Sequence, residues 1–245
     1  MNGQINAHAQ VGLLIAARRN MRNVILIAIL LPTALAAQIT DAPPRALPGT
    51  ATAQLVQSLQ AAKEHASHVW RDVPAMNKDG TVNGYVEIPR GERRKWEFDM
   101  KANARAVDRV MPPEIGGYPV NYGFVPQTVS YDGDPFDVLV LGPALPGGEL
   151  AIGVIVGLMF MEDEKGLDSK VVTSPVDASG QPRYSLTPAD RTRIGGYFAR
   201  YKQHEPGKFS KVPGWGSAAD GLAHVQTAHA FFRDCAKVTG RCLLQ

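Results

Sequence analysis

The spacing of hydrophobic and polar residues changes near residue 80, where a helical period gives way to short strands. Before this point, apolar residues recur every three or four positions, and this predicts an amphipathic helix at 51–70 on the outside of a domain. A turn at 77–80 follows it. The apolar positions of the helix are Leu55, Leu59, Ala62 and Ala66.

From residue 85 to 173 the chain carries short stretches of alternating or wholly apolar residues, separated by Gly and Pro. Many short strands in succession, with no helix between them, favour a closed or nearly closed antiparallel β-barrel. The predicted strands are residues 85–89, 95–99, 106–110, 118–125, 136–142, 151–160 and 170–173.

Two helices are predicted after the barrel. Thr187 is typical of a helix N-cap, with Asp190 completing a capping box, and helical spacing continues to Tyr201. Ser217 caps a last helix that runs to about Phe232. The predicted fold class is therefore α+β and β-rich. Its expected parts are a leader at 1–37, a linker at 38–50, a helix and turn at 51–80, the barrel domain with its C-terminal helices at 81–234, and a tail at 235–245.

The leader has the features of a secretory signal peptide. A basic start at Met21, which is an alternative true start of the chain, precedes an apolar run at 24–31, and cleavage is expected after Ala36 or Ala37. The run is shorter than the roughly 20 residues that span a bilayer, and Pro32 interrupts it. Export to the periplasm is therefore expected, without stable membrane association after cleavage. An uncleaved anchor and a chance apolar leader on a cytoplasmic protein are the alternatives.

Composition and charge are those of an ordinary globular protein. Hydrophobic residues make up 44% and charged residues 20%, and the net charge of +3 is scattered, so nothing indicates a nucleic-acid partner. Cys235 and Cys242 are the only cysteines, too few for a Cys₄ or Cys₂His₂ zinc site. An exported chain would meet an oxidising compartment, which predicts a Cys235–Cys242 disulfide. In a cytosolic enzyme the pair would remain free thiols.

Three carboxylates stand close together at Asp132, Asp134 and Asp137. In an extended chain Asp132 and Asp134 share a face, and Gly133 lets another backbone approach closely. A bend at Pro135 would return Asp137 towards them. Clustered carboxylates at the end of a strand suit Mg²⁺, Mn²⁺ or Ca²⁺. A solvated acidic turn is the alternative, whereas an EF-hand is excluded because its sixth position, counted from Asp132, is Asp137 instead of Gly.

Further charged groups lie along the barrel region. A second acidic loop at 161–170 separates two predicted strands, although by itself it has the composition of a solvated hairpin tip. Acids in two clusters together with many cations suggest a polyanion held between metal ions and basic side chains. The cations are Lys95, Arg109, Lys170, Lys202, Lys208 and Lys211.

These segments resemble the family I soluble inorganic pyrophosphatases. The segment from Asp132 to Asp137 matches the signature of that family, and the match extends from about Val82 to Phe232 with the blocks in the order of the family. The leader, the helix at 51–70 and the cysteine tail lie outside the resemblance. The matching blocks are residues 87–89, 95–97, 108–109, 118–123, 132–137, 163, 168–170, 201–202 and 207–215.

The resemblance implies a five-stranded OB-like β-barrel with outer helices, and the hydrolysis of pyrophosphate to two phosphates. It also implies several Mg²⁺ ions per site, with Mn²⁺ as a substitute, and a homo-oligomer. By position, Asp132, Asp137, Asp163 and Asp168 match metal ligands, Asp134 the general base, Lys95, Arg109, Tyr122, Tyr201 and Lys202 the phosphate-binding residues, and Glu87 and Glu97 acids near the outer metal. Tyr118 and Lys170 fall in matching blocks and are predicted to support the site.

The chemistry of the residues agrees with this interpretation. Two metal ions about 3.5–4 Å apart can share one water and lower its pKa towards neutrality, and Asp134 would take or orient the proton. Two alternatives remain open at this point. One is a non-catalytic OB-like barrel that binds a divalent cation or a phosphate-containing ligand, and the other is hydrolysis of organic polyphosphates.

Overall fold

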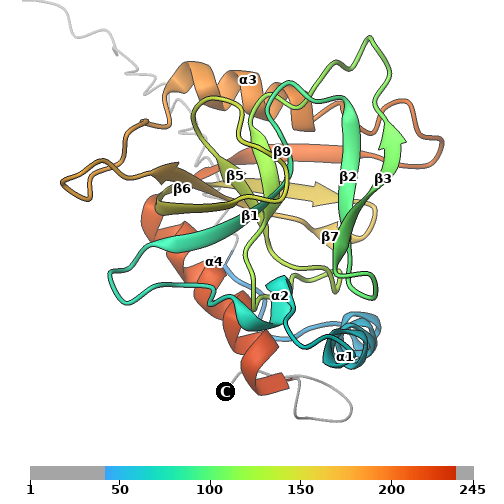
Figure 1. Cartoon of the computed structure of the whole chain (residues 1–245). Helices are drawn as coiled ribbons and strands as arrows, with labels where there is room; N and C mark the ends of the chain where they lie inside the picture. The colour runs from blue at the N-terminus through green and yellow to red at the C-terminus, as the bar shows by residue number, and fades with distance from the viewer. Residues whose placement is uncertain (1–41, 236–245) are drawn as a thin grey trace, which may run out of the picture. The chain divides into compact units, whose positions relative to one another are not determined.

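The computed structural model describes residues 42–235 (Figure 1). The predicted leader at 1–37, the beginning of the predicted linker and residues 236–245 of the predicted tail lie outside these residues. The predicted Cys235–Cys242 disulfide therefore lies outside them as well. Within residues 42–235, no helix is both long and apolar enough to cross a membrane.

A ring of five strands forms the centre of the fold, as the resemblance implies. The ring closes because the 14-residue strand β6 is long enough to pair with β1 near its start and with β8 further along. Around the ring the strands are β1 (Val82–Ile88), β4 (Asn121–Phe124), β5 (Asp137–Val140), β8 (Lys170–Pro175) and β6 (Leu150–Asp163).

One pairing in the ring departs from the expected antiparallel arrangement. Strands β5 and β8 run parallel, with Val138 opposite Val171 and Val140 opposite Thr173. Parallel neighbours need a long connection, and here the connection contains the whole of β6. The prediction of a purely antiparallel barrel is therefore wrong at this edge.

In the described part of the chain, four further strands lie outside the ring. β2 (Arg94–Asp99) and β3 (Ala104–Val110) form a separate hairpin, whereas β7 (Gly166–Leu167) and β9 (Ser210–Gly216) pair with β6. Neither β7 nor β9 was expected. β9 contains a Pro and two Gly residues, which weaken a strand signal in the sequence. Its only strand partner within residues 42–235 is β6, and such an edge position tolerates a proline.

The helices begin where their caps predict. The capping boxes at Thr187 and Ser217 are both formed, and they start α3 (Pro188–Phe198) and α4 (Ala218–Ala230). α3 ends three residues before the predicted Tyr201. α4 continues into a π-helical turn, η1 (Phe231–Cys235).

The predicted helix at 51–70 is two helices instead of one. α1 (Gly49–Lys63) ends before α2 (Val69–Asp72) begins. His68 separates them because its backbone is extended and its ring accepts the backbone N–H of Arg71, which is an N-cap arrangement. Helical spacing of apolar residues continues through the break, so the sequence pattern alone could not locate it.

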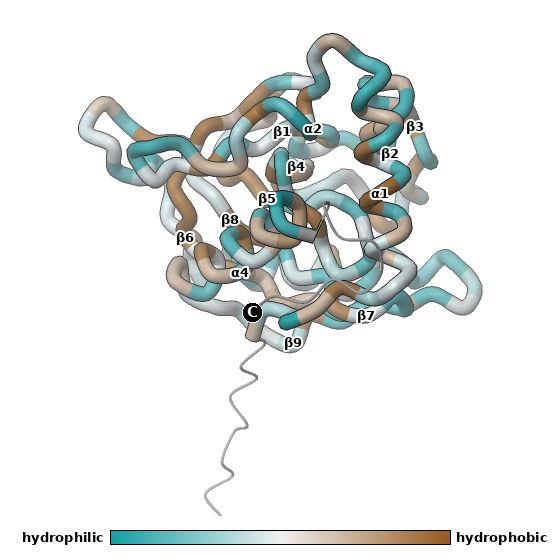
Figure 2. The backbone as a smooth tube through the Cα atoms, turned by 90° about the horizontal axis from the view of Figure 1, so that it is seen from below, coloured by the Kyte–Doolittle hydropathy of each residue, from teal (hydrophilic) through white to brown (hydrophobic). Residues whose placement is uncertain are grey.

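Three clusters of buried apolar side chains stabilise these elements. Two of them involve the ring strands, and α4 packs against β6 and β8. Hydrophobic residues accordingly follow strands such as β6, whereas hydrophilic residues are common in the connecting loops (Figure 2). The third cluster fixes the N-terminal helices by joining Leu55 of α1 and Trp70 of α2 to Phe124 of β4 and to Phe231.

Candidate active site

One cavity collects most of the charged residues that the sequence singled out. Its walls come from the 130–137 loop, the turn after β6, the β2–β3 hairpin, the segment after α3 and one face of α1. Two of the predicted tyrosines, Tyr122 and Tyr201, also line it, whereas Tyr118, Lys170 and Lys211 do not. The lining acids are Glu87, Glu97, Asp108, Asp132, Asp134, Asp137, Asp163, Glu164 and Asp168, and the lining cations are Lys95, Arg109, Lys165, Lys202 and Lys208.

The loop that carries Asp132 and Asp134 is a tight turn. The N–H of Gly133 donates to the carbonyl of Ser130 at 3.1 Å, and the N–H of Asp134 donates to Oδ1 of Asp132 at 3.1 Å. Gly133 has a φ of +97°, which favours glycine. The prediction that strand alternation orients the two acids is therefore wrong, although the turn still directs both towards the cavity.

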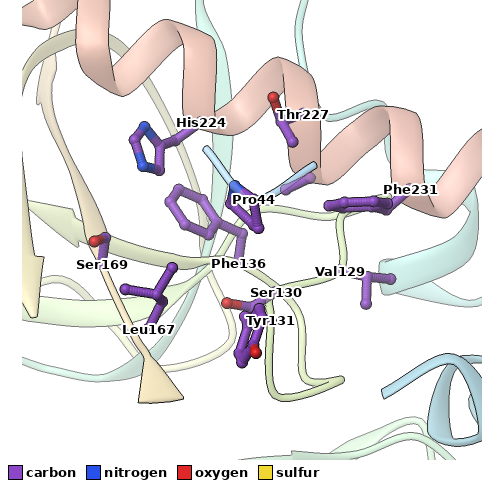
Figure 3. A pocket seen from close by; sticks show the side chains of 11 residues that line it. Pro44, Val129, Ser130, Tyr131, Phe136, Leu167, Ser169, His224, Thr227 and Phe231 are labelled. Carbon is purple, nitrogen blue, oxygen red and sulfur yellow. The ribbon is translucent and has the colours of Figure 1, made fainter. Parts of the chain in front are cut away.

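A mostly apolar pocket adjoins this loop and is lined by its residues Ser130, Tyr131 and Phe136 (Figure 3). Phe136 is buried there, and its ring stacks against that of His224 on α4, with 6.2 Å between the ring centroids. The N–H of Phe136 also donates to the hydroxyl of Thr128 at 2.9 Å. The loop is thus anchored on its apolar side next to Asp137, the first residue of β5.

Lys170 holds two of the predicted metal ligands. Its ammonium, which is 1% exposed, contacts the carboxylate of Asp137 and lies 2.9 Å from Oδ1 of Asp168. Burial opposes the charge of Lys170, but these two acids outweigh it and raise the pKa of the ammonium. Burial, together with repulsion from Asp137, also raises the pKa of Asp168 to about 7, against the attraction of Lys170.

Lys202 binds the second acidic loop in a similar way. Its Nζ lies 2.6 Å from Oδ2 of Asp163 and 3.0 Å from Oε1 of Glu164. Asp163 is 5% exposed, and its other oxygen accepts the backbone N–H of Lys165 at 2.7 Å. Each oxygen of this carboxylate is thus engaged.

Asp134, the predicted general base, has a neighbour on each oxygen. Gln54 of α1 donates to its Oδ1 at 2.5 Å, and the ammonium of Lys165 lies 3.5 Å from its Oδ2. Partial burial in the cavity and repulsion from Asp132 raise the pKa of Asp134 to about 6. A carboxylate with that pKa is ionised at neutral pH and more basic than an ordinary aspartate, as a general base requires.

The β2–β3 hairpin contributes the predicted phosphate-binding cations. The Nζ of Lys95 contacts Glu97 and lies 3.5 Å from Asp108. The guanidinium of Arg109 lies 2.8 Å from Asp108 and 2.9 Å from Glu205, yet its buried Nε has no hydrogen-bond partner within residues 42–235. A buried donor without a partner is suited to an anionic ligand.

The tyrosines and Glu87 provide neutral or poorly ionised groups. Burial, followed by repulsion from nearby acids, raises the pKa of Tyr122 and of Tyr201, so both hydroxyls remain donors. Burial also raises the pKa of Glu87, whose carboxyl accepts the N–H of Phe98 at 2.7 Å. Tyr118 differs from the other predicted residues, because it is 1% exposed and packs in the core behind Tyr122.

The donor set fits divalent cations by charge and chemistry. Nine acids and five cations line the cavity, so acids remain in excess after the buried ammonium of Lys170 is added. Within residues 42–235, no three His, Cys, Asp or Glu side chains converge on a single metal position. The reason is visible in the ion pairs, since Lys165, Lys170 and Lys202 each draw two acids to themselves. Hard oxygen donors in excess suit Mg²⁺ or Mn²⁺.

Several residues that line the cavity have no role predicted from the sequence. Glu164 and Lys165 belong to the second acidic loop, and Asp108 directly precedes Arg109. Gln54 and Ser58 gave no signal, because uncharged polar residues on a helix with apolar spacing are normally exposed to solvent. Only the packing of α1 against the loop places them in the cavity.

Comparisons with known proteins identify the family. A family model for inorganic pyrophosphatase matches residues 84–233. The inorganic pyrophosphatase of Sulfolobus acidocaldarius is 40% identical over 164 residues, which cover 63% of this chain and 93% of that protein. The solved inorganic pyrophosphatase of Coxiella burnetii is 37% identical with a TM-score of 0.61, covering 66% of this chain and 100% of that one.

The enzyme of Thermus thermophilus gives a similar result, with 34% identity and a TM-score of 0.62 over 68% of this chain and 99% of that one. The sequence match and the fold match therefore agree on the family. The chain belongs to the inorganic pyrophosphatase family.

Proposed function

We propose that this chain hydrolyses inorganic pyrophosphate to two phosphates with the help of Mg²⁺. The observation that carries the proposal is the cavity itself, which brings the acids of the 130–137 loop together with the cations of the β2–β3 hairpin and of the segment after α3. Relatives that are 37–40% identical to this chain are named inorganic pyrophosphatases. A non-catalytic barrel, the alternative from the sequence, would not require an acid placed as a base.

The excess of acids explains why the reaction needs added cations. Pyrophosphate is an anion and would be repelled by a cavity in which acids outnumber basic groups. Bound metal ions would offset this charge and lower the pKa of the attacking water. Asp132, Asp137 and Asp168 would hold them at the loop, and Asp163 would hold a further ion, once the lysine contacts of these acids are exchanged.

The remaining groups have distinct roles in the transfer. Asp134 accepts the proton of the attacking water, because it lies beside the metal-binding acids and its pKa is about 6. Lys95, Arg109 and Lys202 bind the phosphates and offset the charge that develops on the leaving group. The hydroxyls of Tyr122 and Tyr201 donate hydrogen bonds, as their raised pKa values allow.

Phosphate release tests the proposal directly. The purified full chain is incubated with pyrophosphate in Mg²⁺, in Mn²⁺ and in EDTA. We expect release with either metal and none in EDTA. Asp134→Asn should lower kcat by about 10²–10⁴-fold with little change in KM, the range typical for loss of a general base. Glu114→Gln, an acid-to-amide change at an exposed position outside the cavity, is the matched control. Near-normal turnover by Asp134→Asn would show that the base is another group.

We also propose three further properties. The leader that begins at Met21 indicates export, the resemblance indicates a homo-oligomer, and an oxidising compartment would favour a Cys235–Cys242 disulfide. Tripolyphosphate and ATP should be assayed beside pyrophosphate, because hydrolysis of longer polyphosphates uses the same chemistry.

A further inference from the structure

The helix α1 contributes to the cavity although it lies outside the segment that matches the family. The family model begins at residue 84, whereas α1 spans Gly49–Lys63. Two of its residues, Gln54 and Ser58, line the cavity together with the charged groups described above. This wall of the site is therefore an addition to the matched domain.

The contact between Gln54 and Asp134 is direct. The amide Nε2 of Gln54 lies 2.5 Å from Oδ1 of Asp134, across 80 positions of sequence. An ionised carboxylate has no hydrogen to donate, so the amide must present its N–H₂ to it. The other oxygen of Asp134 lies near Lys165 at 3.5 Å, which leaves Gln54 as the closer partner.

The helix is held firmly enough to position a side chain. Ala51, Leu55 and Ala62 are at most 1% exposed and belong to the third apolar cluster, where they pack with Trp70 and Phe124. The buried face of α1 is thus fixed to the body of the domain. Gln54 precedes Leu55 and lies at the margin of that face, half-buried, where it can reach the cavity.

The loop is shaped to receive the helix. A Cβ on Gly133 would lie 3.1 Å from the Cα of Ala51 and 3.0 Å from the amide carbon of Gln54. Any larger residue at this position would also be strained by the positive φ. The absence of a side chain at Gly133 therefore lets α1 approach the turn that carries Asp134.

We infer that Gln54 is a positioning residue for the reaction, which holds the carboxylate of Asp134 in the orientation from which it accepts the proton. The inference rests on the proposed function of Asp134. The hydrogen bond fixes one carboxylate oxygen, so the other is directed into the cavity near Lys165. Its loss would leave the half-exposed carboxylate free to rotate.

Kinetics of variants of the full chain test this role. Gln54→Ala should lower kcat for pyrophosphate about tenfold, as expected for losing one hydrogen bond to a charged group, with KM changed by less than about twofold. Gln54→Glu should lower kcat further, because it keeps the size of the side chain but places a second negative charge next to the carboxylate of Asp134. The control is Gln57→Ala, which removes the same side chain from an exposed position on the same helix and should leave kcat unchanged.

A double variant separates positioning from a general structural effect. If Gln54 acts through Asp134, adding Gln54→Ala to Asp134→Asn should produce little further loss of kcat. The same pair is compared by thermal unfolding in EDTA, where the losses of Tm should be less than additive because the two residues share one contact.

Equal loss from Gln54→Ala in both backgrounds, or wild-type kcat in Gln54→Ala and Gln54→Glu, would overturn the inference. A fall in Tm with unchanged kcat would also overturn it, because it would assign Gln54 to stability alone. If the wild-type chain released no phosphate, the proposed function would be wrong. Additive losses of Tm in the double variant would show, independently of activity, that Gln54 and Asp134 do not interact.

Discussion

Lys170 offers the sharpest test of how charge is arranged in this cavity. Its ammonium is 1% exposed and touches the carboxylates of Asp137 and Asp168, which are themselves only 18% and 16% exposed. Replacement of Lys170 by Met preserves much of its length but leaves Asp137 without its cation, and at pH 7 also the ionised fraction of Asp168, whose pKa is about 7. We expect the variant to be clearly less stable than the wild type when metal is absent.

The size of the loss can be estimated from this geometry. Breaking a buried ion pair by removing one partner costs about 3–5 kcal/mol. Protonation sets a limit, because an unpaired aspartate can take up a proton at about 1.36 kcal/mol for each pH unit above 3.9, or about 4 kcal/mol at pH 7. At pH 5 the same limit is only about 1.5 kcal/mol. The free energy of unfolding should therefore fall by about 3–4 kcal/mol at pH 7 and by less than half of that at pH 5.

Thermal unfolding in EDTA measures the effect. For a domain of this size the loss at pH 7 corresponds to a Tm lower by about 6–16 °C. Mg²⁺ should narrow the difference, since a bound cation supplies the missing positive charge. Lys208→Met is the matched control, because Lys208 also forms an ion pair, at 2.6 Å to Glu205, but is 40% exposed and should contribute less than about 1 kcal/mol. Equal losses in the two variants, or a loss that neither pH nor Mg²⁺ changes, would refute the argument.

Three other predictions concern metal, pH and the tail. Asp137→Ala should reduce activity more than Asp163→Ala, and high Mg²⁺ should partly restore only the latter; activity losses of equal size at every Mg²⁺ concentration would remove this distinction. Since burial raises the pKa of Asp168 to about 7, the folded chain in EDTA retains a proton that the unfolded chain has lost, and stability should fall as pH rises from about 4 to 7. Denaturant titrations measure the free energy of unfolding of the wild type and of Asp168→Asn across that pH range. If the pKa of Asp168 were that of an ordinary aspartate, the two proteins would show the same dependence on pH. A Cys235–Cys242 bridge would contribute about 2–3 kcal/mol by loop closure, and mass spectrometry that finds two free thiols on a chain retaining residues 21–36 would contradict both bridge and export.

The sequence predicted those parts of the fold that depend on local chemistry. The capping boxes at Thr187 and Ser217 placed two helix starts correctly, because hydrogen bonds between neighbouring residues determine them. The parallel pairing of β5 with β8 was missed, since it depends on how β6 crosses between them. β9 was missed as well, because its signal as a strand is weak and pairing with β6 provides what its composition lacks.

The candidate site shows the same division between local and long-range information. Asp132, Asp134 and Asp137 were recognisable because acids of one kind stand close together in the chain. Their orientation was not, because a turn at Gly133 replaced the expected strand. The roles of the lysines as partners of these acids required the folded structure, in which Lys170 contacts Asp137 and Lys165 lies 3.4 Å from Asp132, each across 33 positions of sequence.

Gly133, which lies between two acids of the signature, has a positive φ and also leaves room for α1. In this chain the missing side chain of Gly133 is what allows Ala51 and Gln54 of α1 to reach the turn. The charged residues of the signature can be recognised from the sequence. A glutamine on another helix cannot, because in the sequence it resembles any polar residue on a helix surface. Gln54 became visible only because its amide lies 2.5 Å from Asp134 while the apolar face of its helix is buried. A site built from a family signature can therefore include a residue that the signature does not contain, and packing decides which one.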